Sequence, residues 1–362
     1  MGNAASTAIW LLLLPLLLTL THSLPRDVLL DRLGQHTNAL ALVHVTPTPL
    51  DVMKRIRVLC WVNTFHENHE TRLKDIKRTW GSKCDKILFM SDIEDLAIPT
   101  VRITAPPTHE MLWQKHREVV KMLIREYSEQ DFDWVFKCDD DTFVLMENLK
   151  QYLDSPEIRD WNMSKPLILG HRMTLQWWEM QRPLNPLEEL DPEHAQAVNT
   201  VLQATEKQGG LYYTPGGGGY ALNWAYLRQL NAILDDPHCL PGEVIPDDWA
   251  ISFCMWFHDV VPRDTRDSKQ RERFHQYNAI ELYFKQPDEE AYDHAIFESI
   301  YEENNWYSDH FGIGWKTGAD CCAPDTIAFH YVKPPFMTLY YEYYYGNNSD
   351  ISQSQTAEPE SN

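Results

Sequence analysis

Short apolar runs alternate with amphipathic stretches from residue 57 to residue 170, and this alternation limits the folds open to the chain. The apolar runs predict strands over residues 57–63, 86–91, 100–104, 133–138 and 166–170. Between them, the spacing of apolar residues predicts helices over residues 70–80, 109–127 and 145–153. Strands that alternate with helices indicate an α/β fold with a mostly parallel sheet covered on both faces.

Three consecutive aspartates, Asp139, Asp140 and Asp141, directly follow the strand predicted over residues 133–138. In an open parallel sheet, ligands bind at the carboxyl ends of the strands, so these carboxylates are candidates for a site. Because side chains alternate along an extended chain, we expect Asp139 and Asp141 to face one side and Asp140 the other. Two carboxylates together suit a hard cation such as Mn²⁺ or Mg²⁺, which would neutralise a diphosphate. The alternative is a solvated turn in which one aspartate caps the next helix.

The net charge of the chain and the absence of two nucleotide-binding motifs reduce the number of possible functions. The chain holds 32 Lys and Arg against 53 Asp and Glu, and its net charge of −21 argues against nucleic acid as a partner. Neither a GxxxxGK[ST] phosphate loop nor a GxGxxG turn after the first strand is present, which argues against an ATPase or a dinucleotide enzyme. Nucleotide hydrolysis and sugar transfer from a nucleotide remain as candidates, with a metal ion holding the phosphates.

The N-terminus carries an uncharged apolar run of 13 residues over positions 8–20, and the first charged side chain is Arg26. At about 1.5 Å per residue the run covers roughly 20 Å, which is less than the roughly 30 Å of a bilayer core. Residues 1–24 are therefore either a cleavable signal peptide or an uncleaved signal anchor, and both address a membrane. The mixed composition of residues 25–54 suits a stem between the membrane and a folded domain.

Seven cysteines and the sequons that begin at Asn162 and Asn347 agree with entry into the secretory pathway and with a glycoprotein. No CxxC pair occurs, so disulfides are a better interpretation than a zinc site, and the odd number leaves at least one thiol over. Residues 184–208 have the composition of an insertion. Residues 346–362 are polar and are predicted to be a disordered tail.

Eight motifs follow one another in the order of a known family. They are LCWVNT (59–64), TW (79–80), KILFMS (86–91), KCDDDTFV (137–144), GGGGYAL (216–222), DDWAISFC (247–254), DCCAPD (320–325) and FHYV (329–332). Together they resemble the glycoprotein-N-acetylgalactosamine 3-β-galactosyltransferases, the core 1 O-glycan synthases, within the Fringe-like β-1,3-glycosyltransferases. The resemblance covers about residues 55–345.

This resemblance implies a GT-A fold, a catalytic domain over residues 55–345, Mn²⁺ as cofactor and UDP-galactose as the donor. The implied reaction is the inverting transfer of galactose to O3 of GalNAc on Ser or Thr of a glycoprotein or glycopeptide. It also implies a single-pass type II protein of the Golgi membrane, with secretion after cleavage of the signal as the alternative. A second copy of the chain, in a homodimer, is a further possible partner.

The resemblance also assigns roles to single residues. It implies that Asp248 is the general base, although the family pattern at this place is Glu-Asp and this chain has Asp247-Asp248. Capping of the helix that the pair opens is the alternative. The resemblance further implies Asp139, Asp141 and His330 for the metal, and Lys115, Asp139 and Asp140 for the UDP-sugar. Thr64 and Ser91 stand at predicted strand ends and are candidates for the uridine or ribose. Gly216, Gly217, Trp306 and Tyr331 are candidates for the acceptor, although an aromatic residue more often belongs to the core. Taken without the family, a lone histidine such as His330 is more often structural.

Residues 216–219 are four glycines, which we expect to let the backbone approach a sugar where a Cβ would collide. A plain flexible turn is the alternative. By matched position, the resemblance implies the disulfides Cys60–Cys84, Cys239–Cys254 and Cys321–Cys322, which leaves Cys138 free.

Two other functions compete with this interpretation. One is a non-catalytic relative, such as a chaperone of the same fold or a lectin-like binder. The other is a β-1,3-glycosyltransferase with a different acceptor. Retention of Asp139, Asp141, Asp248 and His330 favours an enzyme over a chaperone.

Overall fold

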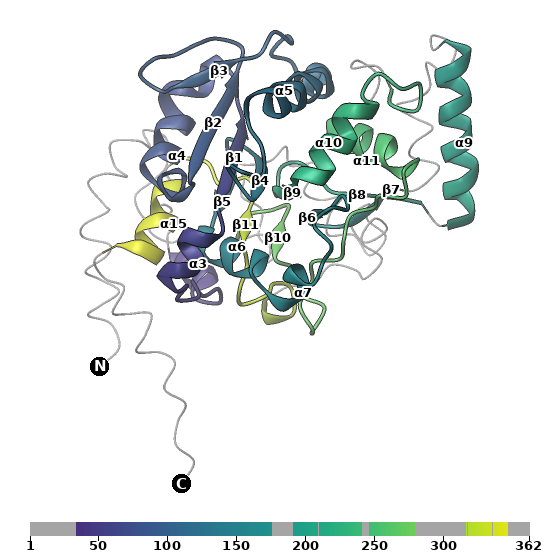
Figure 1. The fold of residues 1–362 in the computed structure, drawn as a ribbon. Coiled ribbons are helices and arrows are strands. Elements are labelled where there is room, and N and C mark those ends of the chain that lie inside the picture. The colour runs from purple at the N-terminus through teal and green to yellow at the C-terminus, as the bar shows by residue number, and fades with distance from the viewer. Residues whose placement is uncertain are drawn as a thin grey trace, which may run out of the picture.

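The structure, a computed structural model, describes residues 34–175, 191–208, 210–240, 246–279, 316, 318–334 and 336–346. The strands of its central sheet are β1 (Val58–Asn63), β2 (Lys86–Ser91), β3 (Thr100–Arg102), β4 (Trp134–Asp139), β6 (Ile168–Gly170) and β9 (Tyr220–Asn223). Their order is β3-β2-β1-β4-β9-β6 (Figure 1). From β3 to β4 neighbours run parallel, whereas β9 runs antiparallel to both β4 and β6. The predicted α/β fold with a mostly parallel sheet is confirmed.

Parallel pairing brings the carboxyl ends of β2, β1 and β4 to one edge of the sheet. Asn63, the last residue of β1, lies opposite Met90 of β2 and Asp139 of β4. β1 is buried along its whole length, as expected for a strand that is covered on both faces. The acidic triplet therefore begins at an edge where three strands end together.

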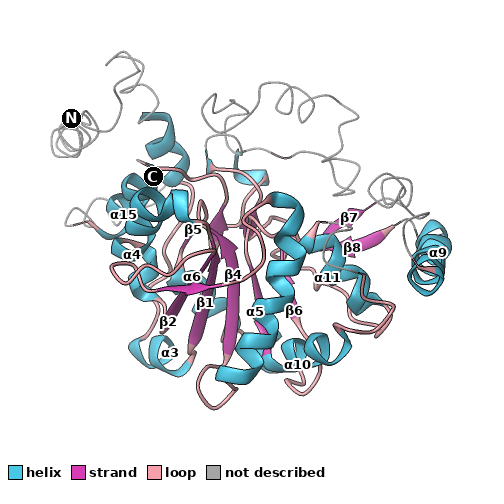
Figure 2. Cartoon of the chain, turned by 90° about the horizontal axis from the view of Figure 1, so that it is seen from above, coloured by secondary structure: helices cyan, strands magenta, loops and turns pink. Residues whose placement is uncertain are grey.

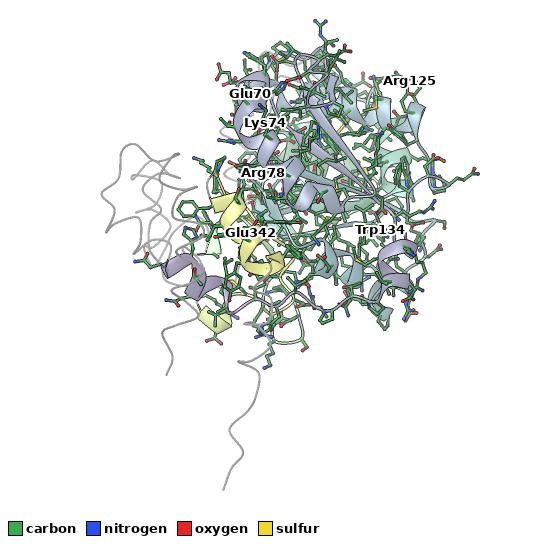
Figure 3. The ribbon with its side chains drawn as sticks, turned by 90° about the vertical axis from the view of Figure 1, so that its left-hand side faces the viewer. Glu70, Lys74, Arg78, Arg125, Trp134 and Glu342 are labelled. Carbon is green, nitrogen blue, oxygen red and sulfur yellow. A yellow bond between two sulfur atoms is a disulfide. The ribbon has the colours of Figure 1, made fainter. Side chains whose placement is uncertain are left out.

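Helices cover both faces of this sheet (Figure 2). The described helices are α3 (Leu50–Arg55), α4 (Lys74–Arg78), α5 (Leu112–Glu126), α6 (Met146–Leu153), α7 (Pro156–Arg159), α10 (Trp224–Ile233), α11 (Asp247–Trp256), α15 (Phe336–Tyr345) and α9 (Pro192–Gln208), the last of which lies apart from the central sheet (Figure 1). On one side α5 packs against α10 and α11, and on the other side α4 packs against α15. Arg78 of α4 donates to Thr338 of α15 over 2.9 Å, although 260 residues separate them (Figure 3).

A smaller sheet brings two distant segments beside the acidic triplet. Its strands are β10 (Phe274–His275), β11 (Ala328–Phe329) and β5 (Phe143–Val144), with β11 in the middle. Because β5 follows the aspartates almost directly and pairs with β11, His330 comes to lie next to them. Two further strands, β7 (Met173–Leu175) and β8 (Leu211–Tyr213), form a separate antiparallel ribbon.

The predicted strands and helices are found with ends that agree or shift by a few residues. The helix predicted over residues 70–80 is helical over residues 69–78, but it is not a uniform α-helix: a π-helical turn at His69–Leu73 leads into the short α4, and a 3₁₀ turn follows at Trp80–Lys83. The hydroxyl of Thr79 donates to the carbonyl of Asp75 over 2.6 Å, and such local bonds compete with helix continuation. π-Helical turns are frequent at functional sites, and this one lies beside the acidic triplet.

Part of the expected stem is packed on the domain. Leu40 is buried in the core, and the side chain of Asn148 on α6 bonds to the backbones of His44 and Thr46, each over 2.9 Å. The folded part therefore begins well before residue 55. The predictions for residues 1–24, for the first part of the 184–208 insertion and for the tail beyond Gly346 fall outside the described residues. Within the ranges that the structure describes, no helix is both long and apolar enough to cross a bilayer.

The structure contains the three disulfides that the resemblance implies, Cys60–Cys84, Cys239–Cys254 and Cys321–Cys322. Cys138 is the free cysteine and is buried, as expected. Burial raises the pKa of its thiol well above the usual value, so it stays protonated at neutral pH and is a poor nucleophile.

Candidate active site

The acidic triplet forms a turn rather than a continued strand. β4 ends at Asp139, whose carbonyl accepts a hydrogen bond from the amide of Thr142 over 3.2 Å. The expected alternation of the three carboxylates is wrong, because the extended conformation stops at the first of them. Asp140 and Asp141 instead share one guanidinium nitrogen of Arg72, at 2.6 and 3.3 Å.

Asp140 is held by side chains of this chain. Besides Arg72, it accepts hydrogen bonds from Thr64 over 2.7 Å and from Asn68 over 2.8 Å. Burial raises the pKa of its carboxyl, and the charge of Arg72 only partly offsets that effect. These contacts fix the conformation of the turn. Asp140 therefore helps to position its neighbours Asp139 and Asp141.

Asp141 and His330 form the closest acid and imidazole pair of the site. One Asp141 oxygen lies 3.1 Å from Nε2 of His330. Burial acts to raise the pKa of Asp141, but His330 and then Arg72 outweigh burial and lower that pKa below the usual value. Asp141 is therefore an ionised carboxylate with an imidazole nitrogen beside it.

Thr64 and Ser91, predicted near the uridine or ribose, and Lys115, predicted near the phosphates, are all buried, and none of them lines the cavity described below. Nζ of Lys115 donates to the carbonyl of Thr64, and the hydroxyl of Ser91 lies 2.7 Å from Nε2 of His69. Burial lowers the pKa of Lys115 to about 8. Thr64 thus links Lys115 to Asp140 of the triplet. Contact of the three residues with a nucleotide stays a prediction.

The glycine loop is crowded by side chains of the chain itself. A Cβ on Gly217 would lie 2.0 Å from Cε1 of His330, and a Cβ on Gly216 would lie 2.4 Å from Nζ of Lys137. Gly219 has φ +74°, a left-handed conformation that favours glycine. These glycines are therefore needed for contacts within the protein, a reason that the sequence did not reveal. The approach of a sugar to these glycines stays a prediction.

Replacing Gly217 by alanine should move His330, because the added methyl would overlap the imidazole ring. For the Mn²⁺-dependent sugar transfer that the resemblance implies, we expect activity to fall at least about tenfold, since small misplacements at a reacting centre are costly. The Mn²⁺ concentration for half-maximal activity should then rise together with this loss. Gly34→Ala is the matched control, because a Cβ at that position meets no atom within 4 Å. Unchanged metal dependence in Gly217→Ala would contradict a metal-binding role for His330.

A second group of charges lies at the start of α11. Nζ of the buried Lys137 is 3.1 Å from Asp139 and 3.7 Å from Asp247, and Asp247 is 3.6 Å from Nδ1 of His116. Burial acts to raise the pKa of Asp247, but Lys137 and His116 outweigh it and lower the pKa well below the usual value. The opposite holds for Asp248, because burial and then the charge of Asp247 raise its pKa to about 7. The pKa values of two adjacent carboxyls are thus shifted in opposite directions, as in acid–base catalytic sites.

A cavity of about 370 Å³ joins the two groups. Of the predicted site residues, it is lined by Asp139, Gly216, Gly217, Asp248, His330 and Tyr331. Tyr331 has φ 55°, and its ring stacks on that of His330 with 3.7 Å between centroids. Trp306 lies outside the described residues. A larger cavity of about 760 Å³ runs beside β6 and contains none of the predicted residues.

The donor set fits a divalent cation in its chemistry. Asp139 and His330 line one cavity, and Asp141 lies 3.1 Å from His330 although it does not line that cavity, so the set comprises two carboxylates and an imidazole. The ligand atoms of Asp139, Asp141 and His330 do not all lie within 4.8 Å of one another. Within the described ranges, the one group of three His, Cys, Asp or Glu residues that meets this distance is His275, Cys321 and Cys322. The sulfurs of that group are joined in a disulfide. For metal binding, Asp139 would use its other oxygen, Oδ2, while Oδ1 keeps its 3.1 Å contact with Lys137.

The sequence interpretation missed two cations of the site. Lys137 lies two residues before Asp139 on the same strand, so the alternation used for the aspartates would have placed it on the same side. Arg72 comes from the π-helical turn, 68 residues before Asp140, and no local pattern marks it. Gln276, Tyr277 and other cavity residues come from segments without any motif.

Comparison with known proteins places this site in a family. A family model described as Fringe-like matches residues 54–263, more than half of the chain. Glycoprotein-N-acetylgalactosamine 3-beta-galactosyltransferase 1 of Xenopus laevis is 27% identical over 297 residues, which cover 82% of this chain and 68% of that protein.

Two more distant relatives share about half of the chain. Beta-1,3-glucosyltransferase of Mus musculus is 23% identical over 203 residues, 56% of this chain and 34% of that protein. N-acetyllactosaminide beta-1,3-N-acetylglucosaminyltransferase 4 of Homo sapiens is 22% identical over 208 residues, 52% of this chain and 48% of that protein. Because the family match spans the central sheet and the acidic triplet, the chain belongs to the Fringe-like family of glycosyltransferases.

Proposed function

We propose that the chain transfers galactose from UDP-galactose to O3 of GalNAc linked to Ser or Thr of a glycoprotein, with inversion at the galactose C1. One observation carries the proposal. A single cavity is lined by a carboxylate and an imidazole, Asp139 and His330, and also by a carboxyl of raised pKa, Asp248. The similarity to the Xenopus laevis enzyme, whose name specifies both sugars, supports this choice of donor and acceptor.

The donor half of the site is the wall around the acidic triplet. Asp139, Asp141 and His330 would hold a divalent cation, which supplies Lewis-acid stabilisation of the negative charge on the departing diphosphate. Arg72 and the donors around Asp140 keep the turn in place while the substrate binds. The ring of Tyr331, stacked on His330, limits the positions that this imidazole can take.

The acceptor half is the wall at the start of α11. Asp248 takes the proton from O3 of GalNAc as that oxygen attacks C1 of galactose. The bond from C1 to the UDP oxygen breaks on the opposite face, so the α-linked donor gives a β-linked product. General-base catalysis of this kind typically contributes about 10²–10⁴ in rate. Asp247, held ionised by Lys137 and His116, raises the pKa of the base beside it.

The pH dependence of transfer should report this base. Asp248 must be ionised to accept a proton, and its pKa is raised to about 7, so kcat/KM should rise with pH up to about 7 and then level off. Asp247→Asn removes the neighbouring negative charge and should move the rising limb to lower pH. A limb that stays in place in this variant would show that another group sets the pH dependence.

A second candidate is transfer of another sugar or to another acceptor within the same mechanism. The relatives at lower identity are named for glucose and N-acetylglucosamine transfer, which favours keeping this candidate. A chaperone-like or lectin-like role is less favoured, because the acidic triplet, His330 and Asp248 are all present. The three disulfides agree with the proposed location in the Golgi lumen. The membrane anchor and the homodimer stay predictions.

A transfer assay distinguishes these candidates. Purified full-length protein is offered radiolabelled UDP-galactose, UDP-glucose, UDP-GlcNAc and UDP-GalNAc with a GalNAc-α-threonyl peptide, a GlcNAc-terminated glycan or a fucosyl peptide. We expect product from UDP-galactose and the GalNAc peptide, with a β1–3 linkage by NMR. Transfer of a different sugar or to a different acceptor would select the second candidate. No transfer from any donor, in protein that is folded by circular dichroism, would overturn the enzymatic proposal.

A further inference from the structure

Lys137 is a fully buried charge in the middle of the site. Only 1% of the residue is exposed, and it sits in β4 between Trp61 of β1 and Tyr220 of β9. Its ammonium lies 3.1 Å from Oδ1 of Asp139, 3.7 Å from Oδ2 of Asp247, and 5.6 Å from the ring centroid of Tyr220. A buried ammonium is retained at low cost only where carboxylates compensate it, and here two carboxylates do so from different elements.

The glycine loop completes the enclosure of this ammonium. A Cβ on Gly216 would lie 2.4 Å from Nζ of Lys137 and 4.0 Å from Oδ2 of Asp139. Gly216 is therefore the residue that leaves room for the ammonium between the loop and β4. In turn, the loop cannot shift toward β4 without meeting the lysine.

The two carboxylates that Lys137 contacts belong to opposite halves of the site. Asp139 is in the donor half, beside His330, and Asp247 precedes the base Asp248 in the acceptor half. We propose that Lys137 is a positioning residue that ties these halves together and so fixes the distance between donor and base. This inference rests on the proposed function for its effect on catalysis, whereas the mechanical link follows from the contacts alone.

Lys137→Met tests the inference, because methionine keeps an unbranched side chain and removes the charge. Its matched control is Lys150→Met on α6: Lys150 is equally buried, and its ammonium lies 2.7 Å from Asp85, away from the cavity. Both variants should lose thermal stability, since both leave a carboxylate without its partner. Only Lys137→Met should lose kcat, by about 10²-fold, the size expected when reacting groups shift by about 1 Å.

Two readouts besides activity separate positioning from general damage. Mn²⁺ binding, measured by calorimetry without substrate, should be unchanged or tighter in Lys137→Met, because the positive charge 3.1 Å from Oδ1 of Asp139, which repels a cation, is removed. Amide hydrogen exchange should become faster in residues 216–219 and in the first turn of α11 together, and in neither segment of Lys150→Met. If Lys137→Met does not fold, Asp247→Asn serves instead. It keeps the pair of Lys137 with Asp139 and should loosen α11 while Mn²⁺ binding persists.

The results of these experiments can overturn the positioning role of Lys137 and the proposed function separately. Equal kcat losses and equal exchange in the two methionine variants would overturn the positioning role, whatever the substrate. An inactive wild type with no Mn²⁺ binding would overturn the proposed function, while coupled loosening of the two segments would still support the link through Lys137.

Discussion

Replacing Asp248 by asparagine should lower kcat by about 10²–10⁴-fold, the range that a positioned general base contributes. Asparagine fills nearly the same space and can still accept the 2.9 Å hydrogen bond from the amide of Trp249, so the start of α11 should keep its conformation. It cannot take the proton from the acceptor hydroxyl. Initial rates at saturating donor and acceptor measure the loss, and KM for UDP-galactose should change little.

The control for this variant is Asp85→Asn. Asp85 precedes β2 at the opposite edge of the sheet, where it bonds to the amide of Val58 and to Lys150. This change can lower stability but should leave kcat per folded molecule unaltered. In the structure Pro246 is the N-cap of α11 and no side chain caps this helix. Wild-type rates in Asp248→Asn would therefore remove the base from the mechanism and favour a structural role for the two aspartates in the first turn of α11, where Asp248 accepts a hydrogen bond from Trp249.

Removal of divalent metal should abolish transfer, and this is the second large effect. EDTA should bring the rate to background, and Mn²⁺ in excess should restore it, because the charge on the departing diphosphate would otherwise be uncompensated. His330→Gln should raise the Mn²⁺ concentration for half-maximal rate by about 10–100-fold, a range seen even for residues that only support metal ligands. His238→Gln is the control, because His238 is paired with Asp236 outside the cavity. Full activity in EDTA would contradict the metal-binding role of the triplet.

Local patterns predicted the frame of the fold well. β1 and β4 are short apolar runs whose burial follows from their composition, and a strand that ends in aspartates is placed at the ligand edge by topology alone. The helix predicted over residues 70–80 is present, but its first turn is π-helical at His69–Leu73 and its α-helical part ends at Arg78, next to the hydroxyl bond of Thr79 to the carbonyl of Asp75. The spacing of apolar residues does not reveal where a side chain competes for backbone hydrogen bonds in this way.

Long-range contacts explain the rest of the difference at the site. The glycines looked like a place for a sugar, yet Gly217 faces His330, 113 positions away in sequence, and no periodic pattern contains that contact. Asp140 was grouped with the ligand residues, but three donors from the segment 64–72 occupy it. The role of Lys137 could have been predicted from the sequence. A charged side chain inside an apolar strand needs a partner of opposite charge, and Asp139 stands two residues further along the same strand.

Anomalous diffraction from crystals soaked with Mn²⁺ and UDP tests the central claim most directly. The account predicts one manganese peak in the cavity, within coordination distance of Asp139, Asp141 and His330, with the UDP diphosphate on its open side and Asp248 on the opposite wall. Bound UDP without a manganese peak at these residues, or manganese beside Asp248 instead, would contradict the assignment of donor and acceptor halves.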